Sequence, residues 1–228
     1  MEWICMITEF GEILSLFAEI SKFVEDDVNV YLIGGGALMY HESKRLTKDI
    51  DIVVRTDSEY DAVRNAFTDL GFASDIPGGA YGRLSIPGIL TRGVFRVDLF
   101  CKEVCGKFSL SEGMVKRART VERFGRVALH VCSVEDILLF KCMTEREGDL
   151  DDCVSINRRH VVDWDVVLKE AKEQSRMGQD VWITWITVRL EDLEDAGIRV
   201  PIMKDMRDLS DKYIEKWEKG LISRNPGL

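Results

Sequence analysis

The sequence predicts an α/β (α+β) fold in which a small mixed sheet flanked by helices is followed by a helical C-terminal part. The first 132 residues alternate strand-like runs with amphipathic helical runs, whereas the pattern from Ser133 onward is helical. With 228 residues, of which 46% are hydrophobic, the chain can bury a sizeable core. We therefore expect two domains, residues 1–132 and 133–228.

Apolar spacing and turn residues place the individual elements. Thr8 to Glu25 has the spacing of a helix, and a second helix is expected at 57–70, ended by Gly71. Strands are expected at 28–33, 49–54, 94–101 and 126–131. Residues 72–87 are rich in turn signals and predict a loop whose tip covers a ligand. The C-terminal helices are expected at 134–146, 149–157, 163–175, 180–195 and 205–219.

Three consecutive glycines follow the first expected strand. Gly34, Gly35 and Gly36 let the backbone turn sharply and leave N–H groups free to face an anion. Good helix formers come next, so these N–H groups would lie at a helix N-terminus, where a phosphate is stabilised. The segment predicts a phosphate-binding turn.

Two aspartates begin the expected strand 49–54. Side chains alternate between faces, so Asp49 and Asp51 share one face while Ile50 points into the core. Two carboxylates this close repel by about 3 kcal/mol at an effective dielectric of about 20, and oxygen ligands beside phosphates suit Mg²⁺. The pair predicts a site for Mg²⁺ and a triphosphate. The alternative is two solvent-facing acids on a half-exposed strand.

A third carboxylate is expected at Asp98, in a strand-like run where Arg96 and Asp98 share one face. If this strand pairs beside the strand 49–54, Asp98 completes a cluster of three carboxylates. Such a cluster can hold two metal ions, with Asp98 next to an attacking hydroxyl as its base. The alternative is a surface acid on an edge strand.

These motifs resemble those of the polymerase-β-like nucleotidyltransferase superfamily. The resemblance is carried by Gly-Gly-x-Ala-Leu at 34–38, Arg-x-Thr-x-Asp-Ile-Asp at 45–51 and Val-Asp-Leu at 97–99. Within the superfamily the chain is most similar to the AbiEii-type nucleotidyltransferases, known as toxins of toxin–antitoxin pairs. The segment 134–152 looks like a helical segment of that group, and the resemblance covers about residues 28–155.

The resemblance implies roles for individual residues. Asp49, Asp51 and Asp98 would bind the metal, and the glycines with Thr47 would surround the phosphates. Lys141 would reach the nucleotide. In the reaction expected from these motifs, Arg45 and Lys141 would neutralise the charge of the triphosphate.

The segment around Lys141 also has a structural interpretation. Ser133 and Asp136 resemble a capping box before an apolar run. Lys141 falls at the margin of a core-facing stripe, where a lysine either contacts a phosphate or simply extends its ammonium to water. The spacing of three residues in 146–152 favours a ladder of ion pairs within one helix, formed by Arg146, Asp149 and Asp152.

The formal net charge of −9 argues against bulk binding of nucleic acid. Five basic residues nevertheless gather within residues 116–126, an interval called here the basic strip: Lys116, Arg117, Arg119, Arg123 and Arg126. The strip predicts either a solvated face or a phosphate-binding surface for an RNA acceptor.

Location and redox state follow from composition. No apolar run approaches the roughly 20 residues of a membrane span, and the N-terminus lacks the basic start of a signal peptide. We therefore expect a cytoplasmic protein that does not contact membranes. The six cysteines form no Cys-x-x-Cys pair, so reduced, buried thiols are expected.

Together these observations predict a Mg²⁺-dependent nucleotidyltransferase that moves a nucleoside monophosphate from an NTP such as ATP to an acceptor hydroxyl, releasing pyrophosphate. The expected partners are the NTP, an RNA or protein acceptor, and a cognate antitoxin. Two alternatives stay open: a non-catalytic NTP-binding toxin-like module held by a partner protein, and a small-molecule (antibiotic-type) nucleotidyltransferase. The sequence does not indicate the oligomeric state.

Overall fold

The computed structural model describes residues 6–75, 88–104, 106, 108–144, 146, 148–177 and 180–224. Its backbone contacts divide the chain into two compact units, Met1–Phe140 and Lys141–Leu228. This division lies within a helix and after residue 132, where the sequence analysis put the boundary between a catalytic core and a helical domain. That functional boundary stays a prediction.

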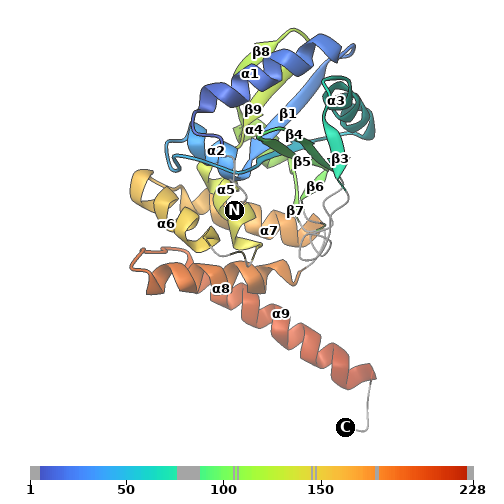
Figure 1. The fold of residues 1–228 in the computed structure, drawn as a ribbon. Helices are drawn as coiled ribbons and strands as arrows, with labels where there is room; N and C mark the ends of the chain where they lie inside the picture. Colours follow the sequence, from blue (N-terminus) through green and yellow to red (C-terminus); the bar gives the residue numbers. More distant parts are fainter. Residues whose placement is uncertain are drawn as a thin grey trace. The chain divides into compact units, whose positions relative to one another are not determined.

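The first unit is built on a mixed sheet, which has seven strands in the described part of the chain (Figure 1). The strand order is β3-β4-β5-β2-β1-β9-β8. β2 lies in the middle, antiparallel to β1 and parallel to β5. The strands are β1 (Val28–Ile33), β2 (Ile50–Val54), β3 (Ala73–Asp75), β4 (Gly88–Arg92), β5 (Phe95–Cys101), β8 (Arg119–Phe124) and β9 (Val127–Val131). A short hairpin adds β6 (Glu103–Val104) and β7 (Phe108–Ser109).

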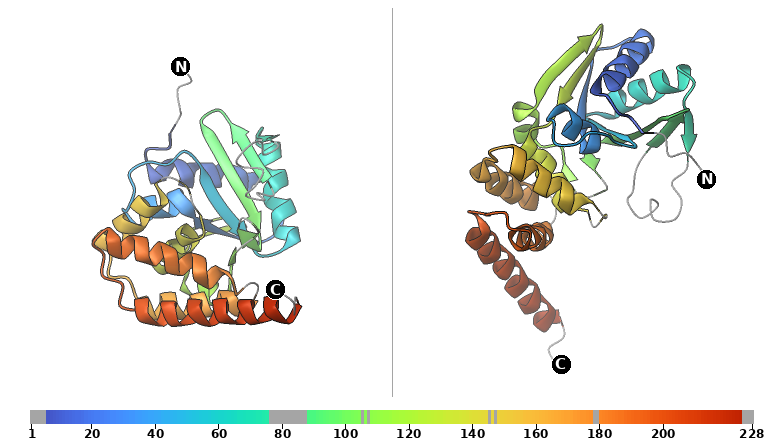
Figure 2. Two further views of the ribbon diagram at one scale, coloured as in Figure 1. Left: turned by 90° about the horizontal axis from the view of Figure 1, so that it is seen from below. Right: turned by 60° about the vertical axis from the view of Figure 1, so that its left-hand side comes forward.

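Two helices, α1 (Phe10–Ile20) and α3 (Asp57–Asp69), contact each other and the same sheet (Figures 1 and 2). Their apolar faces bury Phe17 and Phe67, which are fully inaccessible. The unit also contains the short helix η1 (Ser21–Phe23), α2 (Gly34–Tyr40), α4 (Glu112–Arg117) and the first seven residues of α5 (Val134–Cys142). Helices therefore flank a mixed sheet, as the sequence predicted.

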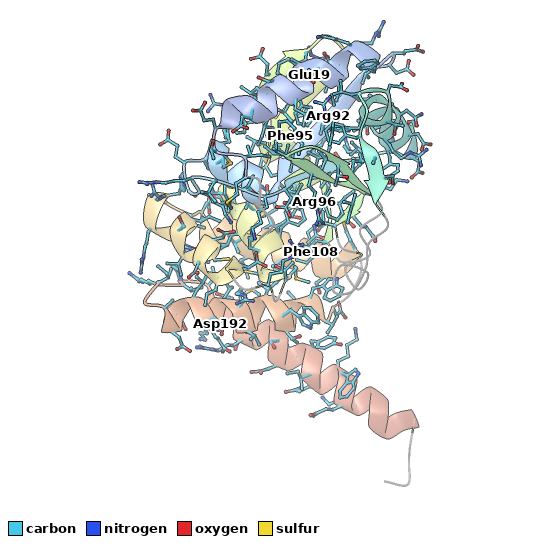
Figure 3. The ribbon with its side chains drawn as sticks, viewed as in Figure 1. Glu19, Arg92, Phe95, Arg96, Phe108 and Asp192 are labelled. Atoms are coloured by element: carbon cyan, nitrogen blue, oxygen red, sulfur yellow. The ribbon has the colours of Figure 1, made fainter. Side chains whose placement is uncertain are left out.

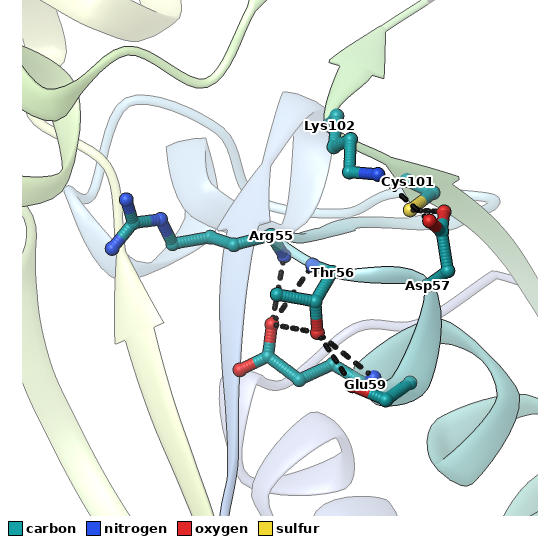
Figure 4. Close-up of polar contacts among 7 residues, drawn as sticks. Arg55, Thr56, Asp57, Glu59, Cys101 and Lys102 are labelled. Carbon is teal, nitrogen blue, oxygen red and sulfur yellow. Dashed lines mark hydrogen bonds and ion pairs between the residues drawn. The ribbon is translucent and has the colours of Figure 1, made fainter.

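The exit from β2 is fixed by the capping box of α3 (Figure 4). The Thr56 hydroxyl accepts a hydrogen bond from the Glu59 N–H at 3.1 Å, and the Glu59 carboxylate accepts from the backbone N–H groups of Arg55 and Thr56 at 3.0 and 3.1 Å. The next residue, Asp57, pairs with Lys102 at 2.8 Å just after β5. These contacts satisfy amide groups that a helix start leaves open, and they hold the ends of β2 and β5 together.

Arg92 connects the outer part of the sheet to α1 (Figure 3). Its guanidinium donates to the Glu19 carboxylate at 3.0 Å and to the Leu70 carbonyl at 2.9 Å. It also lies 4.9 Å from the centre of the Phe72 ring, within the range of a cation–π contact. β4 is thereby attached to the helical layer.

The second unit is helical: it contains the end of α5, α6 (Asp149–Arg159), α7 (Trp164–Met177), α8 (Trp182–Asp195) and α9 (Met203–Arg224). α8 contacts α6, α7 and α9, and it buries Ile186 and Leu190 completely. The helices predicted from the sequence are present, so the predicted helical C-terminal part is confirmed. None of the described helices is both long enough and apolar enough to span a membrane.

The residues of the basic strip differ in how far they are buried. Arg117 ends α4 and makes a two-pronged ion pair with Asp136, with N–O distances of 2.6 and 3.2 Å, and the Asp136 side chain is completely buried. Arg119 and Arg123 are exposed on β8, the edge strand of the sheet, which contains a bulge at residues 120–122. Arg117 therefore neutralises a buried carboxylate inside the unit. Arg119 and Arg123 point to solvent from β8, a strand that the sequence analysis did not predict.

Several boundaries differ from those expected. The three glycines form the first turn of α2, whereas the sequence predicted a turn before the helix. β3, β4 and α4 were not predicted, and α5 ends at Cys142 instead of residue 146. The expected loop tip at 77–79 lies outside the described residues. The cysteines that the structure describes carry free thiols, and Cys132, Cys142 and Cys153 are buried, as expected.

Candidate active site

The central strands bring two of the predicted carboxylates together. β2 and β5 run parallel, with Asp51 paired to Asp98 and Ile52 paired to Leu99. Neighbouring strands are about 4.8 Å apart, and paired residues point to the same face. Asp51 is nearly buried and Asp98 is completely buried. The expectation that the strand of Asp98 pairs beside that of Asp51 is therefore met, and the edge-strand alternative for Asp98 is wrong.

Gly34 lies against the Asp51 carboxylate. β1 ends at Ile33, which pairs with Asp51, so the first residue of α2 follows directly beside that carboxylate. A Cβ atom built on Gly34 would lie 2.1 Å from Asp51 Oδ2, and Gly34 has a φ of +59°. Both observations require glycine, because other residues would clash with the carboxylate and rarely adopt this backbone.

Gly35 and Thr47 make a second close approach. A Cβ atom on Gly35 would lie 2.2 Å from the Thr47 hydroxyl oxygen. That hydroxyl donates to the Asp49 carbonyl at 3.1 Å, and the Thr47 backbone forms a two-way bridge with Ile7 at 2.8 and 3.1 Å. Thr47 therefore fastens the loop that leads into β2 against the glycine turn.

Asp49 and Arg45 lie on that loop. Asp49 immediately precedes β2 and is partly exposed, whereas Arg45 is exposed. The strand predicted to begin at Asp49 begins one residue later, because the pairing with β5 starts at Ile50. Asp49 is consequently positioned by the loop and Asp51 by the sheet.

Asp98 is engaged by a cation from its own strand. Arg96 extends from β5 (Figure 3) and donates from Nε and Nη2 to the two Asp98 oxygens at 2.8 and 3.0 Å. Two carboxylates about 5 Å apart repel by roughly 3 kcal/mol at an effective dielectric of about 20, so a buried pair needs positive charge nearby. Sequence reasoning placed Arg96 on the correct face and assigned it no role. The signal was visible, since residues two apart on a strand are neighbours on one face.

The donor chemistry at this place fits Mg²⁺. Among the described residues, no three His, Cys, Asp or Glu side chains are gathered closely enough to hold a metal ion by themselves. Mg²⁺, however, is commonly held by one or two carboxylates together with substrate phosphates. Asp49 and Asp51 supply oxygen ligands only, and Asp51 lies beside the glycine-rich first turn of α2. These residues therefore fit the ion when a nucleotide supplies the remaining ligands.

Lys141 belongs to the second unit and is bound there. Its ammonium lies 2.7 Å from Asp149 and 2.8 Å from Asp152, and its side chain is only 14% exposed. Burial alone would lower the pKa of Lys141, but the two carboxylates outweigh it and hold the pKa above its usual value. Asp149 and Asp152, which the sequence analysis placed in a ladder with Arg146 within one helix, pair with Lys141 of α5, and Arg146 precedes α6. A contact of Lys141 with the nucleotide stays a prediction.

The predicted cap of α5 is present. The Ser133 hydroxyl donates to the Asp136 carboxylate at 3.0 Å, and the Asp136 N–H donates to the Ser133 oxygen at 3.3 Å. The same carboxylate receives Arg117, which the sequence analysis had assigned to the basic strip. No spacing in the sequence indicates this pair, because 19 residues separate its members.

We expect Gly34→Ala to destabilise the protein and displace Asp51. A left-handed alanine costs about 1–2 kcal/mol, and the clash with the carboxylate adds about 1–3 kcal/mol. Gly93→Ala is the matched control, because Gly93 has a φ of +58° and nothing within 4 Å of its Cβ position. Urea unfolding of both variants isolates the carboxylate contact. Equal losses of unfolding free energy would show that the Asp51 contact is unimportant.

One comparison assigns the chain to a family. A sequence model of the family described as "nucleotidyltransferase of unknown function" matches residues 11–195, which include both β-strand aspartates and the glycine turn. A search of curated proteins found no match. Because the matched segment covers more than half of the chain, the protein belongs to this nucleotidyltransferase family, DUF6036.

Proposed function

We propose that this protein is a Mg²⁺-dependent nucleotidyltransferase that transfers a nucleoside monophosphate from an NTP to an acceptor hydroxyl. The observation that supports this most is the pairing of Asp51 with Asp98 on the two central strands, next to the close approach of Gly34. Buried acids side by side next to the glycine-rich first turn of a helix suit a metal–triphosphate complex. Family membership supports nucleotidyl transfer as the reaction type.

Each residue has a distinct task in this proposal. Asp49 and Asp51 hold Mg²⁺, which when bound polarises the phosphates and stabilises the charge that develops on them. The glycine turn, formed by Gly34, Gly35 and Gly36, lies beside the triphosphate together with Thr47. Arg45 neutralises part of the triphosphate charge.

The reaction forms one bond and breaks one. The acceptor oxygen bonds to the α-phosphorus, and the bond from that phosphorus to the oxygen bridging to the β-phosphorus breaks. Asp98 accepts the hydroxyl proton, and the released electron pair stays on the departing pyrophosphate. No oxidant or reductant is needed.

We propose RNA, such as the end of a tRNA, as the acceptor. The support is the resemblance of residues 28–155 to AbiEii-type toxins, which also suggests a cognate antitoxin protein. Of the basic strip, Arg119 and Arg123 are exposed and open to a phosphate backbone, whereas Arg117 is committed to Asp136. A protein hydroxyl is the second acceptor class to be tested.

The direct test combines three measurements on the purified full chain. Pyrophosphate release is followed with each NTP and Mg²⁺ in the presence of total RNA, a protein extract or aminoglycosides. Mass spectrometry of the RNA and protein fractions then identifies any added nucleotide. Calorimetry with a non-hydrolysable NTP and Mg²⁺ measures binding without chemistry.

The outcomes separate the proposal from its rivals. Pyrophosphate release with a nucleotide added to RNA supports it, and addition to an aminoglycoside indicates an antibiotic-type enzyme instead. NTP binding without turnover on any acceptor indicates a non-catalytic module. Absence of both binding and turnover overturns the proposal.

A further inference from the structure

The second unit contains a pocket lined by residues of α7, α8 and α9, called here the α7–α9 pocket. Its volume is about 450 Å³, and Ile183 and Leu209 contribute apolar wall. Four basic side chains of α7 and α9 also line it: Lys172, Arg176, Lys212 and Lys216. Asp180 is the one acid among the described residues that line the pocket, so the lining has a formal charge of +3. This is a local concentration of positive charge in a chain whose net charge is −9.

The single acid of the pocket already has partners. The Asp180 carboxylate accepts a hydrogen bond from the Ser175 hydroxyl at 3.1 Å and pairs with the Lys216 ammonium at 2.9 Å. Asp180 thereby ties α7 and α9 to the start of α8. In the part of the chain that the structure describes, Lys172 and Lys212 have no ion-pair partner. These two lysines are therefore the cations that an incoming anion would meet.

The acids of α9 lie on a different side of the helix from the pocket. Residues three or four apart share a helix face, so Leu209, Tyr213 and Lys216 project to the pocket together. Four acids recur at the same spacing on another face, and none of them lines the pocket: Asp208, Asp211, Glu215 and Glu218. An anion in the pocket would consequently not be repelled at close range by the acids of α9.

Aromatic side chains lie next to these cations. Tyr213 is half-buried and lines the pocket, and Trp217 follows one helical turn later on the same side of α9. The Trp217 side chain is 56% exposed, which is unusual for a large apolar group. A groove of basic residues that track a backbone, combined with aromatic rings on which bases stack, is the general recognition mode for single-stranded nucleic acid.

We propose that the α7–α9 pocket binds single-stranded RNA, with backbone phosphates at Lys172 and Lys212 and a base stacked on Trp217. The inference goes beyond the proposed function, because this binding takes place in the second unit and needs neither NTP nor turnover. An acidic peptide would also satisfy the lysines, but it would not require the exposed indole. The combination of unpaired lysines with Trp217 therefore favours RNA.

The test measures binding of a fluorescently labelled single-stranded RNA of about 12 nucleotides by anisotropy, at several KCl concentrations. Each phosphate contact of a single strand adds about 0.7 to the slope of log affinity against log salt. Lys172→Gln with Lys212→Gln should therefore lower this slope by about 1.4 and weaken binding about tenfold or more near 0.1 M KCl. Trp217→Ala should weaken binding at least about fivefold and leave the slope unchanged, because stacking releases no counterions.

A matched control removes the same charge from elsewhere in the second unit. Arg199→Gln with Lys204→Gln changes two exposed positions that do not line the pocket, so affinity and slope should stay as in the unmodified protein. Circular dichroism verifies that each variant is folded. Lys212→Glu, at an exposed position, provides a second variant if the Lys172/Lys212 variant folds poorly, and it should weaken binding at least as much.

Three results would overturn the inference. The first is an absence of RNA binding by the unmodified protein, and the second is equal affinity and slope for the Lys172/Lys212 variant and its control. The third is binding of a glutamate-rich peptide that depends on the same lysines while RNA does not bind, which would assign the pocket to an acidic protein segment.

The inference and the proposed function fail in different ways. If the Lys172/Lys212 variant loses RNA binding and no RNA is ever modified, the pocket is upheld and nucleotidyl transfer to RNA is lost. If a nucleotide is added to RNA with the same KM for RNA in that variant as in the unmodified protein, the transferase is upheld and the RNA site in the pocket is lost.

Discussion

Replacing Asp49 and Asp51 together by asparagine is expected to abolish NTP consumption while the fold persists. Metal ions stabilise phosphoryl transition states by several kcal/mol, and each 1.36 kcal/mol is a factor of ten in rate. The rate of pyrophosphate release should therefore fall by about 1,000-fold or more. Asparagine has nearly the shape of aspartate, so the close contact between position 51 and Gly34 is kept.

The thermal stability of the Asp49→Asn, Asp51→Asn variant shows whether a loss of turnover comes from the lost carboxylates or from unfolding. Because asparagine keeps the shape of aspartate and the substitution relieves the repulsion between the two carboxylates, the melting temperature should change little. The matched control is Asp61→Asn with Asp69→Asn, two exposed positions on α3, which should leave turnover unchanged. Pyrophosphate release that survives in the Asp49/Asp51 variant would remove these residues from the metal site.

Replacing Lys141 by methionine is expected to be the most damaging single change in the second unit. It leaves Asp149 and Asp152 adjacent, with side chains only 6% and 10% exposed and without their shared cation. Breaking a buried ion pair from one side costs about 3–5 kcal/mol, which is roughly 6–20 °C in melting temperature for a chain of this size. Thermal unfolding followed by circular dichroism measures the loss.

Two further variants test the cause. Lys169→Met, at an exposed position on α7, should change the melting temperature little. Adding Asp149→Asn and Asp152→Asn to Lys141→Met should recover much of the loss, because no charge is then left buried. A weaker affinity of Lys141→Met for NTP, without any loss of stability, would instead favour the phosphate-binding role.

The same lysine gives the protein a dependence on alkaline pH. Its pKa is raised in the folded state, so its contribution to stability is complete below the unfolded value of about 10.4 and is lost as pH rises through the folded pKa. Above about pH 10, urea unfolding should show stability falling more steeply for the unmodified protein than for Lys141→Met. Equal slopes would contradict the assignment.

Local patterns carried the sequence-based prediction of the site. The glycines, the alternation of Asp49 with Asp51, and the strand around Asp98 are all set within a few residues, so spacing alone predicted them. The pairing of Asp51 with Asp98 was expected and is found in register. Arg96 was visible on the correct face, but which partner it would choose depends on how deeply Asp98 is buried.

Contacts distant in sequence account for what was missed. Arg117 looked like a surface residue until α4 placed it beside Asp136. The two carboxylates of α6 that pair with Lys141 were likewise not assigned to it from the sequence. β8 was not predicted because its bulge interrupts the alternation of side chains and its outward residues are charged. In each case packing between elements, which a single sequence does not display, decided the role.

The charges on the edge strand β8 affect self-association of the protein. An unpaired strand edge offers N–H and C=O groups to any other extended chain and is a common starting point for aggregation. Of the strands that the structure describes, only β9 pairs with β8. Arg119 and Arg123 lie on this outer strand, and the bulge twists it locally. Two copies whose strands met with these arginines opposite each other would bring like charges together. The arginines that we propose to face an RNA backbone would therefore also disfavour that contact between neighbouring molecules.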